Sequence, residues 1–198
     1  IELRGRQFPE DQGPLAHPVR PESFQEINNF YTATVYEKGA EVIRMLKTLV
    51  GDAAYAKALD LYFDRHDGRA CTIEDWLTVF EDATGRDLAQ FKRWYAQAGT
   101  PHLAVSEAFE NGTYTLSFAQ STPPSVPTPD PQPPVIPGAA GLLGPNGTEV
   151  MATQILEVTQ ARQSFSFPGL AAKPVPSILR GFSAPVVLDH TPDHGFLL

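Results

Sequence analysis

The side chains of this sequence that could carry chemistry form no complete active site by spacing alone. Among five histidines, His190 and His194 have the four-residue spacing that places two imidazoles on one face of a zinc-binding helix. Pro192 lies between them, and the surrounding residues predict a strand and a tail rather than a helix, so we predict no zinc site there. The sequence has neither a glycine-rich phosphate-binding loop nor a Gly-x-Ser-x-Gly nucleophile motif.

The single cysteine and the net charge narrow the class of protein. Cys71 cannot form an intrachain disulfide, which fits a reducing compartment and a cytoplasmic location. The formal charge of −8 leaves no basic surface of the kind that nucleic acid or an acidic membrane requires, and no apolar run is long enough to cross a bilayer. The chain starts at Ile1 without a methionine or a secretion signal, which indicates a piece of a longer protein or a processed one.

Charged residues and prolines are distributed unevenly, which predicts two kinds of structure in one chain. Residues 1–100 hold 16 acidic residues, 12 basic residues and 4 prolines. Residues 101–198 hold 7 acidic residues, 3 basic residues and 15 prolines. We expect the boundary near Gly99-Thr100, with one domain at 1–99 and the next at 100–198.

The first hundred residues predict helices with short loops. Prolines make residues 1–22 irregular, and apolar residues then recur at helical spacing, with glycines as stop signals. The expected helices are 31–50 ended by Gly51, 52–67 capped by Asp52, 72–84 capped by a Thr72–Asp75 capping box and ended by Gly85, and 87–98 opened by Asp87 and ended by Gly99.

After Pro101 the apolar residues alternate, which predicts strands. The expected strands are 103–105 and 114–118 across an Asn111-Gly112 turn, 135–143 and 148–158, then 164–167, 177–180 and 186–188. About seven strands predict a small antiparallel sandwich. Seven of the 12 residues from Pro123 to Pro134 are proline; we interpret them as a stiff hairpin loop, with a ligand for an SH3-like partner as the alternative.

The segment from Asn28 to Val42 could by itself be an ordinary amphipathic helix start. Its motif Tyr36-Glu37-Lys38-Gly39, however, closely resembles the aminopeptidase N family of zinc metallopeptidases, most strongly the bacterial branch. The resemblance covers nearly the whole chain and is most specific in the first hundred residues. It also rests on Ala16–Pro21, Leu61–Gly68, Phe91–Tyr95, Ala98–Pro101 and, more loosely, Phe182–Val186.

This resemblance implies an α+β chain in two parts. The first would be the all-helical C-terminal part of a thermolysin-like catalytic domain, and the second a small antiparallel β-sandwich. The family binds zinc through a His-Glu-x-x-His helix and a more distant Glu, and the sequence lacks that motif. We therefore expect no zinc ligands in this chain and expect the zinc of the parent protein to be bound upstream of Ile1.

The resemblance also implies roles for three residues. The tyrosine of the family motif, here Tyr36, points into the zinc site, where a phenol hydroxyl can stabilise the tetrahedral oxyanion. We expect Tyr31 and Asn29 to contact the substrate. Tyr31 would lie off the helical face of Tyr36 if the helix already runs there, so it could line the pocket or simply pack. Glu37 and Lys38 are expected to be supporting or surface charges.

The leading hypothesis is that the parent protein is a zinc aminopeptidase that removes N-terminal residues from peptides. Its partners would be peptide substrates and the remaining domains of the parent protein, and this chain alone would be inactive. The alternative is a non-catalytic binding or interaction module that uses the β-sandwich and the proline-rich loop.

Overall fold

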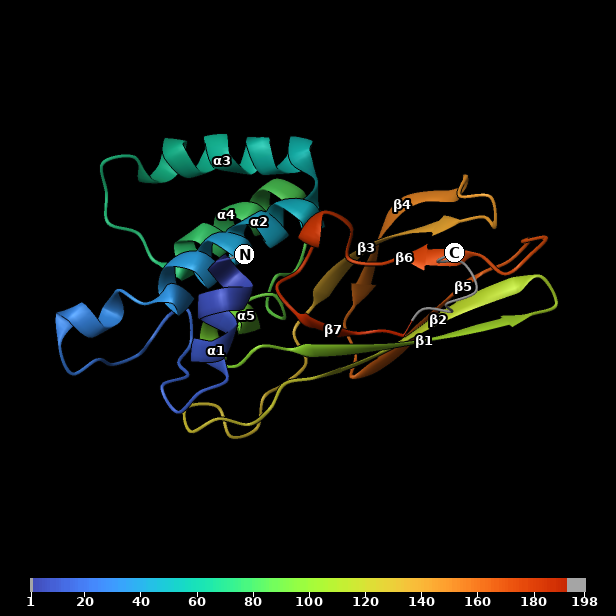
Figure 1. The fold of residues 1–198 in the computed structure, drawn as a ribbon. Helices are drawn as coiled ribbons and strands as arrows, with labels where there is room; N and C mark the ends of the chain where they lie inside the picture. The colour runs from blue at the N-terminus through green and yellow to red at the C-terminus, as the bar shows by residue number, and fades with distance from the viewer. Residues whose placement is uncertain (1, 192–198) are drawn as a thin grey trace.

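A helical part and a strand-rich part lie side by side in the computed structural model, which describes residues 2–191 (Figure 1). The helices come first in the chain and the strands follow, so the predicted α+β order is confirmed. The helical elements are the π-helical turn η1 (Leu3–Gln7), α1 (Phe8–Asp11), the 3-10 turn η2 (Ile27–Phe30), the π-helical turn η3 (Thr34–Lys38), α2 (Gly39–Val50), α3 (Asp52–His66), α4 (Ile73–Thr84), α5 (Arg93–Ala96) and, within the second part, the 3-10 turn η4 (Arg180–Phe182).

The start and end of α4 follow the predicted capping signals. The Thr72 hydroxyl accepts the Asp75 backbone N–H at 3.1 Å, and the Asp75 carboxylate accepts the Thr72 backbone N–H at 2.8 Å. This reciprocal pair satisfies two N–H groups that the helix itself cannot pair. Gly85 ends the helix in the left-handed conformation, with φ 71°, which favours glycine. The capping box and the glycine stop are confirmed.

The core of the helical part is formed by residues of α2 and α4, and α3 packs against both helices. Val42, Met45 and Leu46 of α2 are fully buried and belong to the same apolar cluster as Val79 and Phe80 of α4. Helix α3 contributes less, because Ala58 is its one buried residue and Phe63 is 58% exposed. Helix α3 lies on the outside of the helical part (Figure 1).

Four details of the predicted helices are wrong. The first helix begins at η3 and not at residue 31, because the Tyr31 backbone is non-helical. The fourth helix shrinks to the four residues of α5, because residues 89–92 form turns and the Leu88 N–H donates to the Glu81 carboxylate at 2.9 Å instead of pairing along a helix. Gly51, not Asp52, is the cap of α3, with no side-chain hydrogen bond. Residues 3–11 are helical despite Pro9, because the wider π turn pairs the Phe8 N–H with the Leu3 carbonyl.

The strand-rich part is a sandwich of two sheets, with seven strands in the described residues. One sheet has the order β5-β2-β1-β7 and the other the order β4-β3-β6. The inner faces bury alternate residues such as Tyr114, Leu116 and Phe118. The strands are β1 (His102–Glu110), β2 (Thr113–Ser121), β3 (Ile136–Leu143), β4 (Glu149–Val158), β5 (Arg162–Phe167), β6 (Val175–Ser177) and β7 (Val187–Asp189).

Two features of the sandwich differ from the predictions. Strand β7 pairs in parallel with β1, where the Val187 N–H donates to the Pro101 carbonyl at 2.9 Å, so the first sheet is mixed rather than antiparallel. Strand β6 ends at Ser177, where a strand was expected to begin. The chain turns after it, and Leu179 and Phe182 adopt φ values of 53° and 55° that no strand allows.

The glycine-rich strand β3 has a physical reason for its small residues. It lies between β4 and β6, and Ile136 through Leu142 are all buried. The guanidinium of Arg180 lies directly over Gly141, in the space that a Cβ would occupy. Arg180 reaches Thr153 at 2.7 Å from this position and also pairs with Glu149. Because Gly141 has no side chain, the charged Arg180 side chain can cross the sheet at this position.

The proline-rich loop connects the two parts by hydrogen bonds. Its carbonyls accept from the helical part: the Trp94 indole donates to Val135 O at 2.7 Å, and Arg93 donates to Pro133 O at 2.5 Å. Ser125 and Thr128 exchange backbone hydrogen bonds of 3.0 and 3.1 Å, which forms a tight turn rather than an extended polyproline segment.

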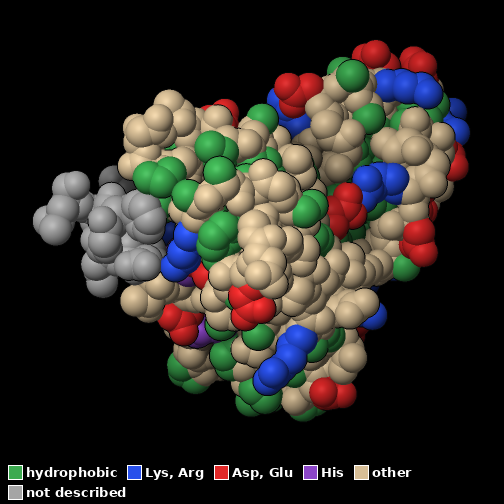
Figure 2. Space-filling model, turned by 90° about the vertical axis from the view of Figure 1, so that its right-hand side faces the viewer, with side chains coloured by type: hydrophobic (Ala, Val, Ile, Leu, Met, Phe, Trp, Pro, Cys, Tyr) green, Lys and Arg blue, Asp and Glu red, His purple; other side chains and the backbone are tan. Residues whose placement is uncertain are grey.

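The surface of the sandwich end is sparsely charged. Figure 2 looks onto that end and shows hydrophobic side chains in small separate groups, with scattered Lys, Arg, Asp and Glu between them. This view agrees with the low charge of residues 101–198. None of the helices in residues 2–191 is both long and apolar enough to cross a membrane.

Replacing Thr72 by Ala should lower the free energy of unfolding by about 1 kcal/mol, because it removes the side-chain half of the capping box. Thr72→Ser keeps the hydroxyl and should retain most of the stability. Urea unfolding followed by circular dichroism measures both variants. Equal stability of Thr72→Ala and the wild type would contradict the energetic role of this cap.

Candidate functional site

The Tyr36 side chain projects from the π-helical turn η3 into solvent. It is 57% exposed, and Tyr31, just after η2, is 59% exposed. Their rings stack with centroids 6.2 Å apart and planes 25° apart. Tyr31 would lie off the helical face of Tyr36 only if the helix already ran through it. The Tyr31 backbone is non-helical, at φ −87° and ψ 68°, so the helix has not begun there. The structure therefore brings these two predicted site residues together.

The third predicted site residue, Asn29, lies in η2 and is exposed. Its backbone N–H donates to the Glu26 carbonyl at 3.0 Å and so helps to form the turn. The loop that carries η2 extends away from the helical part (Figure 1). Asn29 and Tyr31 thus belong to one projecting loop, and Tyr36 belongs to the helix that follows it.

Glu10 of α1 holds the beginning of the Tyr36 turn. Its carboxylate accepts both the Thr34 backbone N–H at 2.8 Å and the Thr34 hydroxyl at 2.6 Å. Thr34 is fully buried, so these bonds are shielded from water. A negative charge at a helix start also interacts favourably with the unpaired N–H groups there. The N-terminal segment therefore fixes where the Tyr36 turn begins.

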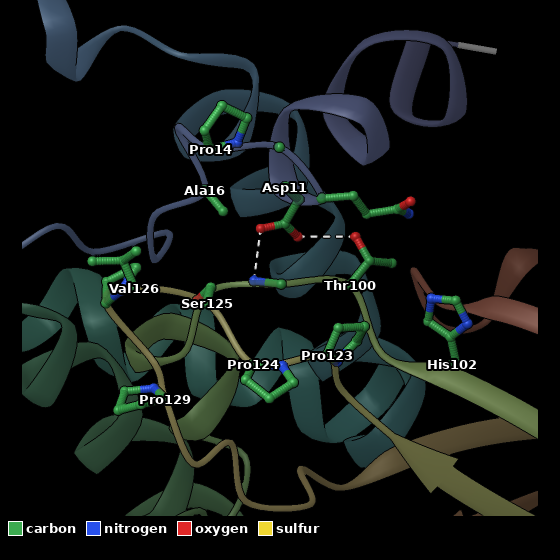
Figure 3. Close-up of a pocket in the computed structure, with 14 residues that line it drawn as sticks. Asp11, Pro14, Ala16, Thr100, His102, Pro123, Pro124, Ser125, Val126 and Pro129 are labelled. Atoms are coloured by element: carbon green, nitrogen blue, oxygen red, sulfur yellow. Dashed lines mark hydrogen bonds between the residues drawn. The ribbon is translucent and has the colours of Figure 1, made fainter.

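Lys38, two residues after Tyr36, fixes the other end of this turn. Its ammonium is buried and donates to the Asp11 carboxylate at 2.7 Å and to the Gly99 carbonyl at 3.0 Å. The Asp11 carboxylate also accepts the Gly99 N–H at 2.8 Å and the Thr100 hydroxyl at 3.0 Å, as Figure 3 shows. One buried ion pair thus joins α1, the Tyr36 turn and the junction between the two parts.

The Asp11 carboxylate is held in its charged form. Burial by itself raises the pKa of Asp11, but the Lys38 ammonium and the hydrogen bonds from Lys38, Gly99 and Gln7 outweigh burial. The net result is a pKa below the ordinary value of 3.8. The Asp11–Lys38 pair therefore remains ionised at neutral pH and holds α1 to the Tyr36 turn.

One cavity lies near the N-terminal segment that holds the Tyr36 turn. It has a volume of about 730 Å³ and lies between the N-terminal segment and the proline-rich loop, with Asp11, Thr100 and His102 on its polar side and Pro14 and Pro124 on its walls (Figure 3). The Tyr36 ring does not line it. Tyr36 and Tyr31 therefore lie on an open surface of the described part of the chain.

The described residues contain no group of three or more His, Cys, Asp or Glu side chains that could hold a metal ion. His190 pairs instead with the Glu107 carboxylate at 2.7 Å. His194, the other member of the spacing pair, lies outside the described residues. The described residues therefore form no zinc site, and they include no cluster of metal ligands near Tyr36.

Sequence reasoning missed Glu10 and Asp11 and left Lys38 among supporting or surface charges. Lys38 precedes Val42 by four residues and Met45 by seven, so it falls on the buried face of the predicted helix. A cation on an apolar face requires an acidic partner. That signal could have identified Lys38 as buried, but nothing in the spacing indicated Asp11, 27 residues away.

Breaking the buried pair should destabilise the protein strongly. Lys38→Met leaves the Asp11 charge buried and unpaired, and Asp11→Asn does the same to Lys38, each at a cost of about 3–5 kcal/mol. The double variant should lose clearly less than the sum of the two. Urea unfolding of the four proteins forms a double-mutant cycle, and additive losses would show that the two side chains do not interact.

The low pKa of Asp11 also makes stability depend on pH. Because the folded-state pKa lies below the unfolded value, the contribution is complete above about pH 3.9 and is lost as the pH falls through the folded value. The unfolding free energy of the wild type should therefore fall more steeply in acid than that of Asp11→Asn. Parallel profiles for the two proteins between pH 5 and pH 2 (roughly the range in which carboxyls titrate) would contradict this role.

Comparison with known proteins agrees with the two-part architecture. Residues 3–95 match the peptidase family M1 domain, and residues 99–191 match a domain of unknown function (DUF3458) with an Ig-like fold. Aminopeptidase N of Haemophilus influenzae is 46% identical over 95% of this chain and 23% of that protein. Aminopeptidase N of Caulobacter vibrioides is 50% identical over 99% of this chain and 23% of that protein.

A solved structure shows the same fold. The crystal structure of Legionella pneumophila aminopeptidase A in complex with aspartic acid matches with a TM-score of 0.82 at 30% identity, and the match covers 91% of this chain and 21% of that chain. The chain thus spans about a quarter of the length of the curated relatives it matches. Sequence and structure together show a peptidase family M1 segment followed by an Ig-like DUF3458 segment, in a chain that is similar over nearly all of its length to aminopeptidase N of these bacteria.

Proposed function

We propose that this chain is part of a zinc-dependent aminopeptidase that hydrolyses N-terminal residues from peptides, with Tyr36 as the residue that stabilises the oxyanion. The observation that carries the proposal is an exposed phenol on a helical turn that is fastened at both ends, by Glu10 to Thr34 and by Asp11 to Lys38. Such fastening keeps a catalytic group in place while its hydroxyl stays accessible. The similarity to aminopeptidase N supplies the class of reaction.

The phenol suits peptide hydrolysis for a simple chemical reason. When water adds to a peptide carbonyl, negative charge develops on the carbonyl oxygen of the tetrahedral intermediate. The Tyr36 O–H would donate a hydrogen bond to that oxygen, and the bond would strengthen as the charge develops. A group held in advance does not have to be ordered during the reaction, which lowers the barrier further.

Tyr31 and Asn29 are proposed to contact the peptide substrate. Tyr31 places its exposed ring beside Tyr36 through their stacking contact, and Asn29 presents an amide from the same projecting loop. An aromatic face and an amide suit the side chain and backbone of a bound peptide, respectively.

Zinc would be bound by residues of the whole protein other than those described, because residues 2–191 present no ligand group. When bound, the metal would supply Lewis-acid polarisation of the peptide carbonyl. We propose residues 1–99 as the end of the thermolysin-like catalytic domain and residues 100–198 as the following domain, because the strands begin at His102. The single cysteine supports a cytoplasmic location.

A non-catalytic interaction module is less well supported by the contacts of the proline-rich loop. Thr128 is buried and accepts the Ala98 N–H at 3.0 Å, and the loop carbonyls are bonded to Arg93 and Trp94. These groups serve the contact between the two parts instead of facing a partner. Turnover of a chromogenic amino-acid substrate by the whole protein, with and without Tyr36→Phe, discriminates the two functions, because the alternative expects no turnover that depends on Tyr36.

In the whole protein, Tyr36→Phe should lower kcat by about 10²–10³-fold, because one hydrogen-bond donor to the oxyanion is lost. Zinc content and circular dichroism should stay unchanged. Replacement of the exposed Tyr31 or Asn29 by Ala should act mainly on KM. The matched control is Tyr55→Phe on α3, which should leave both constants unchanged. Near-normal turnover of Tyr36→Phe would rule out its assigned role.

A further inference from the structure

One histidine of the N-terminal segment contacts the chain just before the turn that carries Tyr36. His17 lies in the run Ala16–Pro21, and both nitrogen atoms of its ring have a hydrogen-bond partner. Nδ1 lies 2.8 Å from the Leu15 carbonyl oxygen, and Nε2 lies 2.8 Å from the Thr32 hydroxyl oxygen. The second contact spans 15 residues of sequence, so it joins the N-terminal segment to the beginning of the Tyr36 turn.

The partners of the His17 ring define which nitrogen carries the proton. A backbone carbonyl only accepts hydrogen bonds, so Nδ1 is the N–H that donates to Leu15. In the neutral ring Nε2 is then an acceptor, and the Thr32 hydroxyl donates to it. This bond directs the hydroxyl proton of Thr32 toward His17 and leaves the lone pairs of the hydroxyl oxygen to accept from other donors.

Thr32 accepts two backbone N–H groups at the start of the Tyr36 turn. Its hydroxyl oxygen accepts the Val35 N–H at 3.2 Å, and its carbonyl oxygen accepts the Tyr36 N–H at 3.1 Å. The first N–H groups of a helix have no partner within the helix, and a hydroxyl that accepts one of them stabilises the helix start. His17 therefore orients the hydroxyl that stabilises this turn.

Thr32 also marks the point at which the projecting loop meets the turn. Tyr31 directly precedes it and stacks on Tyr36. The other end of the loop is held by the same N-terminal segment, because the Arg20 N–H donates to the Tyr95 carbonyl at 3.0 Å. The N-terminal segment thus contacts both ends of the loop, and its contact through His17 acts on the Tyr36 turn.

We propose that His17 is a positioning residue for Tyr36. It directs the Thr32 hydroxyl, and Thr32 fixes the backbone from which the Tyr36 phenol projects. A catalytic group has to be held to within about 0.5 Å of its productive place, so loss of this contact should slow the chemical step more than it weakens substrate binding. The inference rests on the proposed catalytic role of Tyr36 and deepens it, because His17 acts through Thr32 and not on the substrate.

Two amide variants separate the two hydrogen bonds of the ring. His17→Gln places an amide oxygen near the position of Nε2 and keeps an acceptor for Thr32, whereas His17→Asn places its amide near Nδ1 and loses that acceptor. In this chain, the Val35 and Tyr36 amides should exchange with deuterium about 3- to 10-fold faster in His17→Asn, and at nearly the wild-type rate in His17→Gln. The Gly85 amide, bonded at the end of α4, is the internal control. Unchanged exchange in His17→Asn, measured by NMR, would overturn the proposal.

The kinetic test uses the whole protein and the same variants. His17→Asn should lower kcat about 10-fold and change KM by less than about twofold, and His17→Gln should recover most of kcat. Thr32→Val, which removes the hydroxyl, should behave like His17→Asn. Thr48→Val is the matched control on α2, because it removes a hydroxyl that donates to the Arg44 carbonyl at 3.2 Å, and it should leave both constants unchanged.

A positioning role and a general structural role differ in the Tyr36→Phe protein. If His17 acts through the Tyr36 phenol, His17→Asn should lower kcat by less than about twofold once that phenol is gone. An equal loss of kcat with and without the phenol would overturn the proposal. Near-normal turnover of Tyr36→Phe itself would refute the proposed function instead, and the exchange rates of the two amides would then decide whether His17 holds the turn.

Discussion

The buried ion pair between Asp11 and Lys38 is the interaction on which the rest of this structure depends. Two charges that are almost fully removed from water are tolerable only when further hydrogen bonds stabilise them. Gly99 and Thr100 supply such bonds, and they are also the residues at which the helical part ends and the strand-rich part begins. The need to stabilise this one buried ion pair therefore holds three segments of the chain together.

This fastening explains why an exposed side chain can be positioned as well as a buried one. Tyr36 lies between Thr34, bonded to Glu10, and Lys38, bonded to Asp11. The backbone of the turn cannot shift without breaking one of these buried contacts. The phenol itself remains accessible, because the restraint acts on its neighbours. Different side chains thus provide the stability of the turn and the accessibility of the phenol.

Two sets of hydrogen bonds hold the two parts of the chain together. Arg44 of α2 donates to the carbonyls of Gly181 and Phe182, and its guanidinium lies 5.7 Å from the Phe182 ring centre. On the other side, the proline-rich loop accepts hydrogen bonds from the helical part through its carbonyls. Proline lacks an N–H, so a proline-rich loop offers acceptors but few donors, which suits it to side chains such as Arg93 and Trp94.

The sequence by itself determined the features that depend on neighbouring residues. The Thr72–Asp75 cap, the stop at Gly85 and the hairpin across Asn111-Gly112 were predictable because each depends on contacts within a few residues. The family motif also identified Tyr36 as the residue to examine. The predicted 87–98 helix proved to be four residues of α5 after a series of turns, although its apolar residues Leu88, Phe91, Trp94 and Tyr95 are buried.

Only the tertiary structure decided how distant segments complete one another. Asp11 is 27 residues from Lys38, and 88 and 89 residues from Gly99 and Thr100, so no local pattern could pair them. The parallel pairing of β7 with β1 and the stacking of Tyr31 on Tyr36 likewise result from the path of the chain between elements. The physical reason is that propensity and periodicity act over a few residues, whereas buried charges select their partners by proximity in space.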